Sequence, residues 1–303
     1  MRKVLKDNDL EKIFQEQGYI HVPFIEKKQV DFLRKEFHRL IVDSGGSLAA
    51  GETDIPFEGE ITYDFTFIDR NPDYKHNVLE AIDNVFKPVY DKILFNYKPI
   101  IGNYIRKKTD KGEVPLHQNW AFVDERKCTS VSIWVPLIDS HRGNGALEVV
   151  PRSHKRFGEI RGPMVPWELE GIKHEIIAND LVTCAIKAGD AIILDDSIVH
   201  YSHPNKTNDL RIAIQLILIP EEEPSIHYHL DPAVSNESVD ILEVDRDFYT
   251  QFNPWKKPEG VRKIKSLKYR FHPLNHSDFL KTLQEPRFDE KKTLLQKVKT
   301  IFS

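Results

Sequence analysis

The chain is poor in cysteine and has no long apolar run. Its 303 residues include only two cysteines, Cys128 and Cys184. Two thiols cannot build a disulfide framework, so we expect both to be buried in a protein made for a reducing compartment. No stretch reaches the roughly 18 apolar residues that span a bilayer, and the charged N-terminal segment lacks the apolar core of a signal peptide. These absences predict a cytoplasmic protein without a membrane partner.

The sequence also lacks the pattern of a nucleic-acid module. The formal net charge is −4, but residues 255–303 hold 13 Lys and Arg against 5 Asp and Glu. Such a basic segment can bind an anionic partner. No arginine-rich or aromatic-interleaved pattern accompanies it, so a solvated surface is the simpler interpretation. We therefore expect no nucleic-acid partner, and a monomer or homodimer that acts on a small molecule.

Helical periodicity dominates residues 1–95. Two segments repeat apolar residues at three- and four-residue steps, which is typical of a helix with one buried stripe. The first stripe is Val30, Leu33, Phe37, Leu40 and Ile41, and the second is Leu79, Ile82, Val85, Phe86, Val89 and Ile93. Between them, residues 45–57 (GGSLAAGETDIPF) form a glycine-bearing loop whose length makes it a candidate lid or substrate loop.

From about residue 98 the apolar period changes to two. In SVSIWVPL, residues 130–137, apolar side chains alternate with Ser132 and Trp134. In RIAIQLILIP, Ile212 and Ile214 share one face, while Arg211 and Gln215 share the other. Alternation of this kind is typical of strands, and many short strands with glycine turns between them predict an all-β jelly roll or barrel.

The sequence predicts one domain over residues 1–303. We expect a helical N-terminal part over 1–95, a jelly-roll core over 96–220, and a C-terminal extension over 221–303. The extension is predicted to end in a helix from about residue 290. His227 and His229 form an HxH pair in this extension, for which a surface or substrate-loop role is expected.

Five residues in the core carry the spacing of a metal and carboxylate site. His117 and Asn119 are two apart, so on a strand they point to the same face. His200 and Ser202 repeat that spacing, and Arg211 begins the next predicted strand. Two histidines and one oxygen donor match the facial triad of a non-heme Fe(II) oxygenase. Arginine suits a carboxylate, because its guanidinium binds it in a bidentate, permanently charged manner.

The same stretches resemble a known family. PLHQNWAFVDE, SVSIWVPLIDSHRGNGALEVVPRSHK and GDAIILDDSIVHYSHPNKTNDLRIA are similar to segments of the phytanoyl-CoA dioxygenase family of Fe(II)/2-oxoglutarate-dependent oxygenases. The resemblance covers roughly residues 10 to 220. It implies a mainly β fold, the double-stranded β-helix or cupin-type jelly roll, with flanking N- and C-terminal helices.

The resemblance also implies roles for individual residues. His117 and His200 correspond to iron ligands, with Asn119 at the position of the third. Arg211 and Ser202 correspond to the residues that hold the distal carboxylate of the cosubstrate 2-oxoglutarate, and Trp134 to a wall beside it. The implied reagents are Fe(II), 2-oxoglutarate and O2.

Asn119 departs from the family pattern, which usually has aspartate at this position. An amide oxygen can bind Fe(II), but it brings no negative charge to the metal. Four explanations stay open: Asn119 ligates iron in a weaker or retuned enzyme, it marks a chain that has lost catalysis, it is an introduced substitution, or Asp124 or Glu125 supplies the ligand instead.

Two functional hypotheses follow. The first is an Fe(II)/2-oxoglutarate-dependent dioxygenase that hydroxylates an unactivated C–H bond of a small molecule. An anionic substrate is one candidate, with Tyr104 and Arg106 as candidate substrate contacts. The alternative is a catalytically impaired or non-catalytic jelly-roll binding protein, because Asn119 replaces the usual aspartate.

Overall fold

The computed structural model describes residues 2–46, 63–252 and 257–290. Most of the glycine-bearing loop predicted over residues 45–57 lies outside the described residues. The C-terminal helix predicted from about residue 290 lies outside them as well.

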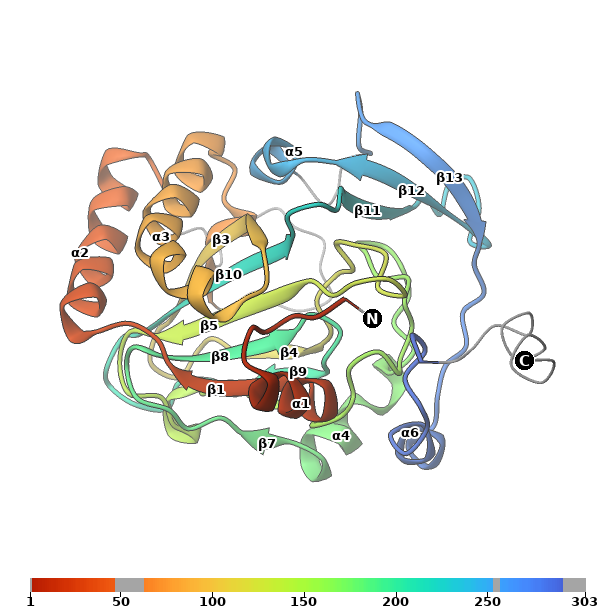
Figure 1. Ribbon diagram of the computed structural model, residues 1–303, viewed down its shortest axis with the longest axis horizontal. Coiled ribbons are helices and arrows are strands. Elements are labelled where there is room, and N and C mark those ends of the chain that lie inside the picture. The colour runs from red at the N-terminus through yellow and green to blue at the C-terminus, as the bar shows by residue number, and fades with distance from the viewer. Residues whose placement is uncertain (1, 47–62, 253–256, 291–303) are drawn as a thin grey trace.

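Two antiparallel sheets form the core of the protein (Figure 1). The larger sheet has six strands in the order β1-β8-β5-β10-β3-β2, and the smaller has four in the order β4-β9-β6-β7. The large sheet contains β1 (Tyr19–Pro23), β2 (Asp64–Phe65), β3 (Tyr97–Lys107), β5 (Val131–Pro136), β8 (Asp190–Asp195) and β10 (Arg211–Pro220). The small sheet contains β4 (Val114–His117), β6 (Glu148–Val149), β7 (Val182–Thr183) and β9 (His200–Ser202).

The two faces of the large sheet differ in chemistry, as the alternation predicts. Ile133 and Ile214 belong to an apolar cluster that also contains residues of the helices. Trp134 and Ala213 belong to a second cluster, which includes Leu147 and Val149 from the segment of β6. The helix-facing side is therefore mainly apolar, while the side that faces the small sheet also carries charged and amide side chains.

Helices cover the outer face of the large sheet (Figure 1). They are α2 (Lys27–Asp43) and α3 (Pro72–Ile93), and α1 (Asn8–Gln17) precedes β1. Both predicted apolar stripes are confirmed, because Leu33 of α2 and Ile82 of α3 are fully buried in the shared cluster. Among the described residues, no helix combines the length and the apolar content needed to cross a membrane.

The N-terminal part contributes more than helices. β1 pairs with β8 at one edge of the large sheet, and β2 with η1 (Thr66–Ile68) lies beside β3 at the other. The described part of residues 1–95 therefore supplies both edge strands of the sheet that the core was expected to build alone.

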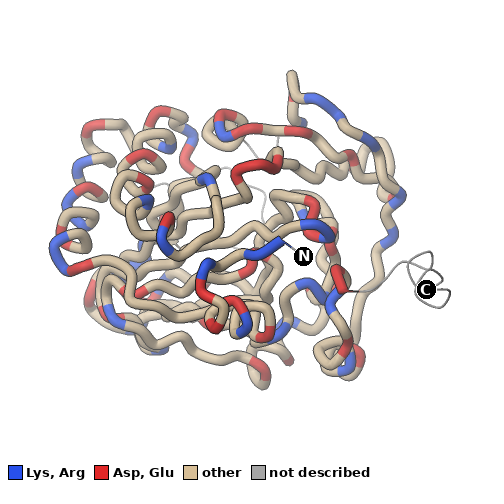
Figure 2. The backbone as a smooth tube through the Cα atoms, viewed as in Figure 1, with Lys and Arg blue, Asp and Glu red and all other residues tan. Residues whose placement is uncertain are grey.

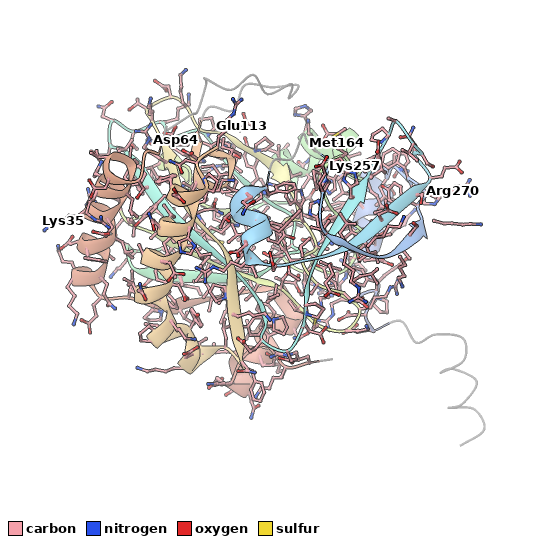
Figure 3. The ribbon with its side chains drawn as sticks, turned by 90° about the horizontal axis from the view of Figure 1, so that it is seen from above. Lys35, Asp64, Glu113, Met164, Lys257 and Arg270 are labelled. Atoms are coloured by element: carbon pink, nitrogen blue, oxygen red, sulfur yellow. The ribbon has the colours of Figure 1, made fainter. Side chains whose placement is uncertain are left out.

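The C-terminal extension contains a sheet that the sequence did not predict. β11 (Ser225–Leu230), β12 (Ser238–Val244) and β13 (Arg262–Lys268) pair in order, with α5 (Arg246–Gln251) after β12 and α6 (His276–Thr282) after β13. Lys and Arg gather along β13 (Figure 2), and some of them pair with acidic residues of β12. From above, Arg270 of this extension lies at the opposite end of the molecule from Lys35 of α2 (Figure 3).

His227 lies in β11 and is 1% exposed, in contact with the rings of Trp120, Phe248 and Phe252. The surface position expected for the HxH pair is therefore wrong for His227. A strand of alternating residues turns its side chain into an aromatic cluster.

A buried ion pair fixes the irregular segment between β4 and β5. Arg161 donates from Nη1 and Nη2 to the two carboxylate oxygens of Glu125, at 2.8 and 2.6 Å, and both side chains are buried. The same guanidinium donates from Nε to the backbone oxygen of Asn119, at 2.8 Å. Arg161 therefore joins residues that are about 40 positions apart in sequence.

We predict that Arg161→Met destabilises the protein by about 3–5 kcal/mol, because it leaves the buried carboxylate of Glu125 without its cation. The measurement is the free energy of unfolding in a denaturant titration. Arg126→Met is the matched control, since Arg126 also pairs with a glutamate, Glu159, but is 54% exposed. Its expected cost is about 1 kcal/mol or less. Equal costs for the two variants would contradict the structural role given to Arg161.

Candidate functional site

His117 and His200 face each other across the small sheet. His117 ends β4, His200 begins β9, and the two residues are register partners with ring centroids 4.1 Å apart. Each ring donates a hydrogen bond from Nδ1 to the backbone oxygen two residues earlier. His117 donates to Pro115 O at 2.7 Å, and His200 donates to Ile198 O at 2.9 Å. A histidine that donates from Nδ1 has its lone pair on Nε2, which is the arrangement of a metal ligand.

Burial keeps both rings in the neutral form that binds metals. It lowers the pKa of His117. It also holds the pKa of His200 well below its ordinary value, and the neighbouring His117 adds to that effect. Two neutral imidazoles therefore present free nitrogens to the same space.

Asn119 lies beside the histidines but not on a strand. β4 ends at His117, so the shared face expected from strand spacing does not extend to Asn119. Its Nδ2 donates to Asp196 Oδ1 at 2.8 Å and to Ser132 Oγ at 3.1 Å. The Asn119 side chain is also within hydrogen-bonding reach of the His117 ring. The amide thus offers a neutral oxygen as the third donor.

Asp196 is a buried carboxylate that the sequence analysis missed. Ser132 donates to its Oδ1 at 2.6 Å. Burial raises the pKa of Asp196 to about 7, against the hydrogen bonds from Ser132 and Asn119, which lower it. The only sequence signal was the DD pair that precedes His200, which has no distinctive spacing.

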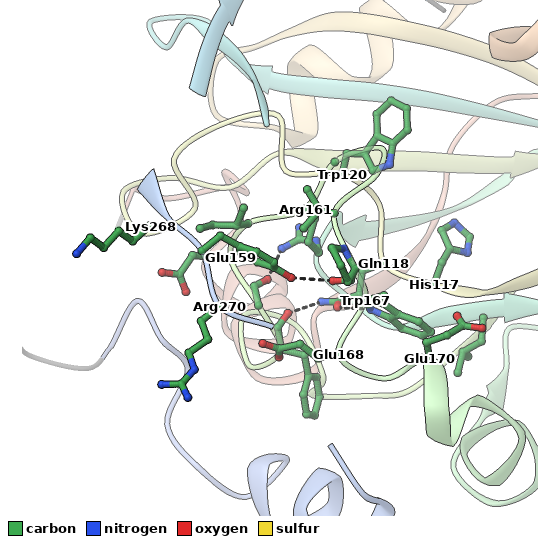
Figure 4. A pocket seen from close by; sticks show the side chains of 18 residues that line it. His117, Gln118, Trp120, Glu159, Arg161, Trp167, Glu168, Glu170, Lys268 and Arg270 are labelled. Atoms are coloured by element: carbon green, nitrogen blue, oxygen red, sulfur yellow. Dashed lines mark hydrogen bonds between the residues drawn. The ribbon is translucent and has the colours of Figure 1, made fainter. Parts of the chain in front are cut away.

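Gln118 attaches the chain between His117 and Asn119 to the rest of the core. Its Nε2 donates to the backbone oxygens of Phe157, at 3.0 Å, and Ser197, at 2.6 Å. Its Oε1 accepts from Trp167 Nε1 at 3.0 Å (Figure 4). Together with the Arg161 bond to the Asn119 backbone, these contacts hold the chain where no strand ladder does.

Arg211 is a buried cation with unused donors. Its Nη2 donates to Gly145 O at 2.6 Å, and its guanidinium carbon lies 5.1 Å from the centre of the Trp134 ring. Nε and Nη1 are buried and find no partner in the described part of the chain. Burial lowers the pKa of Arg211 to about 9, which leaves it mostly charged at neutral pH. A fully buried guanidinium with two free donor positions suits the binding of an anion.

Ser202 and Lys107 lie next to Arg211. Ser202 Oγ donates to Gly145 O at 2.7 Å and accepts from Lys107 Nζ at 2.5 Å. Lys107 is fully buried on β3, opposite Arg211 in the register of β10. Burial, with a smaller contribution from Arg211, holds the pKa of Lys107 well below its ordinary value. Lys107 was not predicted, because only the pairing of β3 with β10 brings it to the site.

Gly145 supplies the backbone oxygen that Arg211 and Ser202 share. Its φ is +74°, and a Cβ at this position would lie 2.4 Å from the backbone oxygen of His203. Only glycine fits this conformation and this space.

Two cavities meet at His117. A cavity of about 90 Å³ is lined by the predicted metal and cosubstrate residues. A larger one of about 420 Å³ lies on the other side of His117 (Figure 4). The small cavity includes His117, Asn119, Trp134, His200, Ser202 and Arg211. The large cavity includes His117, Gln118, Trp120, Arg161, Trp167 and Glu168.

The structure does not bring the two candidate substrate residues to either cavity. Tyr104 is buried on the helix-facing side of β3, where its hydroxyl donates to Leu33 O at 3.0 Å. Arg106 pairs with Asp64 of β2. Neither side chain is among those that line the two cavities, so their predicted substrate role gains no support from position.

The donor set at the small cavity suits a divalent metal. Two imidazole nitrogens and an amide oxygen would leave the other octahedral positions open. Among the described residues, no three His, Cys, Asp or Glu side chains form a group that could hold a metal ion. A metal bound by both histidines would therefore take its third donor from Asn119 or from a group outside that set. Glu125 is held by Arg161, and Asp124 pairs with Lys127 at the surface. The carboxylate alternatives weighed from the sequence therefore do not reach the histidines.

Comparisons with known proteins agree with this fold. A family model described as phytanoyl-CoA dioxygenase (PhyH) matches residues 14–213. The chain is 33% identical, over 146 residues, to the phytanoyl-CoA dioxygenase domain-containing protein 1 homolog of Dictyostelium discoideum; the alignment covers 46% of this chain and 50% of that protein. The chain spans about half the length of the curated relatives it matches.

Two solved structures share the fold. The epimerase SnoN, in complex with Fe3+, alpha ketoglutarate and nogalamycin RO, gives a TM-score of 0.52 at 16% identity, covering 88% of this chain and 96% of its own. EctD from S. alaskensis, with 2-oxoglutarate and 5-hydroxyectoine, gives 0.50 at 21% identity, covering 72% and 78%. At these identities the likeness concerns the fold, and it confirms the predicted mainly β jelly roll.

We predict that Arg211→Met raises the unfolding temperature of the ligand-free protein, because it removes a buried cation that no described carboxylate neutralises. We expect a gain of about 1 kcal/mol or more. Gly145 O stays satisfied, since Ser202 also donates to it. Thermal unfolding without added ligands is the measurement.

Arg106→Met is the matched control. It removes the cation that faces the buried carboxylate of Asp64, so we expect it to lower the unfolding temperature. A loss of stability in Arg211→Met similar to that in Arg106→Met would show that the Arg211 charge is already compensated.

Proposed function

The chain belongs to the phytanoyl-CoA dioxygenase family, and from that membership we propose that it is an Fe(II)- and 2-oxoglutarate-dependent oxygenase that hydroxylates an unactivated C–H bond of a small molecule. The observation that carries the proposal is the small cavity. Two histidines line this cavity, and their Nδ1 bonds leave each Nε2 available to a metal. A buried arginine, Arg211, with two unused donors lines the same cavity.

His117, His200 and Asn119 are the proposed iron ligands. These residues suit a metal for two reasons. Each histidine donates from Nδ1 to a backbone oxygen, which leaves its Nε2 available to a metal. Asn119 donates from Nδ2 to Asp196, which directs its Oδ1 away from that carboxylate. When bound, Fe(II) with 2-oxoglutarate supplies the oxidising chemistry, in which O2 and 2-oxoglutarate are converted to succinate and CO2 while a C–H bond becomes C–OH.

Arg211 is proposed to bind the distal carboxylate of 2-oxoglutarate through the donors that have no protein partner. Trp134 packs against the guanidinium and limits its rotation. Ser202 is proposed to turn its hydroxyl, which donates to Gly145 O in this structure, toward the carboxylate, with Lys107 as its neighbour on the same wall. Because the whole group is buried, water competes poorly for these donors.

The larger cavity is proposed to hold the substrate. It begins at His117, so a molecule in it would present a C–H bond next to the metal position. Its volume of about 420 Å³ is in the range of small-molecule sites. Trp120 and Trp167 provide aromatic walls, while Glu168 and Arg270 give it charges of both signs, which favours a polar substrate (Figure 4).

We propose in addition that residues 1–303 form one oxygenase domain, that it acts in the cytoplasm, and that it works as a monomer or homodimer without a nucleic-acid or membrane partner. Free, buried Cys128 and Cys184 support a reducing compartment. The rival function is a catalytically impaired jelly-roll binding protein, which the neutral side chain of Asn119 favours.

We predict that the Fe(II)-loaded protein converts labelled 2-oxoglutarate to succinate under air with at least one member of a panel of small polar molecules. His200→Ala should abolish both turnover and metal binding, because one of three donors is lost. His203→Ala is the control: His203 pairs with Glu148 at 3.0 Å outside both cavities, so it should leave metal binding unchanged.

The same assay separates the rival function. An impaired binding protein would retain 2-oxoglutarate binding through Arg211 but give no succinate with any molecule tested. Absence of both 2-oxoglutarate binding and metal binding in the wild-type protein would reject the proposal together with its rival.

A further inference from the structure

A carboxylate lies directly behind Asn119, on the side away from the cavity. Asp196 is fully buried in the turn between β8 and β9, four residues before His200. Its Oδ1 accepts from Asn119 Nδ2 and from Ser132 Oγ. The chain has therefore placed a buried acidic group in contact with the amide that occupies the position of the family's acidic ligand.

The hydrogen bonds leave only one orientation for the Asn119 amide. The Ser132 hydroxyl donates its single proton to Asp196, so it can only accept a hydrogen bond from Asn119. The Asp196 oxygen that faces Asn119 accepts as well. The Asn119 atom that faces both must therefore be the NH2 group, which directs Oδ1 to the side of His117.

The same contacts continue into the wall of the small cavity. Gln215 donates to Ser132 Oγ at 3.2 Å and accepts from Asn103 at 3.2 Å. Ser132 is thus held from two sides, and the Asn119–Asp196 contact rests on strands β3, β5 and β10 of the rigid sheet. A support on strands holds a functional group more firmly than a loop does.

We propose that Asp196 is the positioning residue of the metal site: by accepting from the Asn119 amide it fixes the oxygen of Asn119 toward the metal position, and in its ionised form it supplies, from behind the amide, the negative charge that Asn119 lacks. This inference rests on the proposed function. A hydrogen bond from the amide N–H to a carboxylate polarises the amide, which makes its oxygen a stronger donor to a cation. The negative charge of the family's aspartate ligand is thereby kept near the metal position, on the side chain that lies behind Asn119.

The contact between Asn119 and Asp196 affects the substitution Asn119→Asp, which would restore the residue usual in the family. Asn119→Asp places a second carboxylate where an amide nitrogen now lies 2.8 Å from Asp196 Oδ1. Two carboxylates at that distance repel each other unless one takes up a proton. The restoring substitution should therefore help only when Asp196 is exchanged at the same time.

The test is a double-mutant cycle on the full chain, with Co(II) affinity measured by anaerobic titration as its readout. The variants are Asp196→Asn, Asn119→Asp and the reciprocal pair Asn119→Asp with Asp196→Asn. In the wild-type background, Asp196→Asn keeps an oxygen that accepts from Asn119 but removes the charge, so we expect Co(II) affinity to fall about 10- to 100-fold. In the Asn119→Asp background, the same substitution should raise the affinity.

This reversal of sign separates the proposal from a merely structural role, in which Asp196→Asn would weaken binding in both backgrounds or in neither. Asp195→Asn is the control for charge at a distance. Asp195 is also buried, but it accepts from Ser197 and not from Asn119. A fall in Co(II) affinity for Asp195→Asn as large as that for Asp196→Asn would overturn the role of the contact.

The variant His200→Ala lacks one proposed metal ligand, so its Co(II) binding gives the background level of the titration. If the wild-type protein binds Co(II) no better than His200→Ala, the proposed function fails and the inference fails with it. If the wild type binds and Asp196→Asn binds equally well, only the inference fails. Should Asp196→Asn not fold, the reciprocal pair against Asn119→Asp decides alone: higher affinity in the pair supports the proposal, and equal or lower affinity overturns it.

Discussion

The alternation of the two central strands, β5 and β10, is the constraint on which the rest of the molecule depends. One face must be apolar because α2 and α3 pack on it, and the other is then free to carry Ser132, Arg211 and Gln215 toward the small sheet. A shift of one residue in either strand would place these polar groups under the helices. Strand register therefore sets the position of the site before any ligand is considered.

Burying so many polar groups is unfavourable, and the apolar face offsets the cost. Arg211 and Lys107 are both fully buried within one group of residues, and neither forms an ion pair among the described side chains. The helix-covered cluster contributes the hydrophobic stabilisation that such a site requires. Stability and binding capacity are thus assigned to opposite faces of the same strands.

The sequence predicted what local spacing can encode. Strand alternation and the specific family spacing singled out His117, His200 and Arg211, and the structure brings all three to one cavity. Asp196, Lys107 and the Arg161–Glu125 pair had no such signal, because each reaches its partner only through tertiary contacts. β13 was missed for a different reason: its residues are almost all exposed and mostly charged, so it shows no apolar period. Asn119 was expected on a strand, whereas loop contacts hold it.

Gly145 shows how a residue without a side chain can determine where functional side chains lie. Its carbonyl is the common acceptor for Arg211 and Ser202, and its own conformation and surroundings admit no Cβ. A side chain that touches a ligand can be replaced by another of similar chemistry, whereas a Cβ at this position would collide with the backbone oxygen of His203. The reference point of the wall that contains Arg211 and Ser202 is therefore a peptide carbonyl, which substitution of side chains cannot remove.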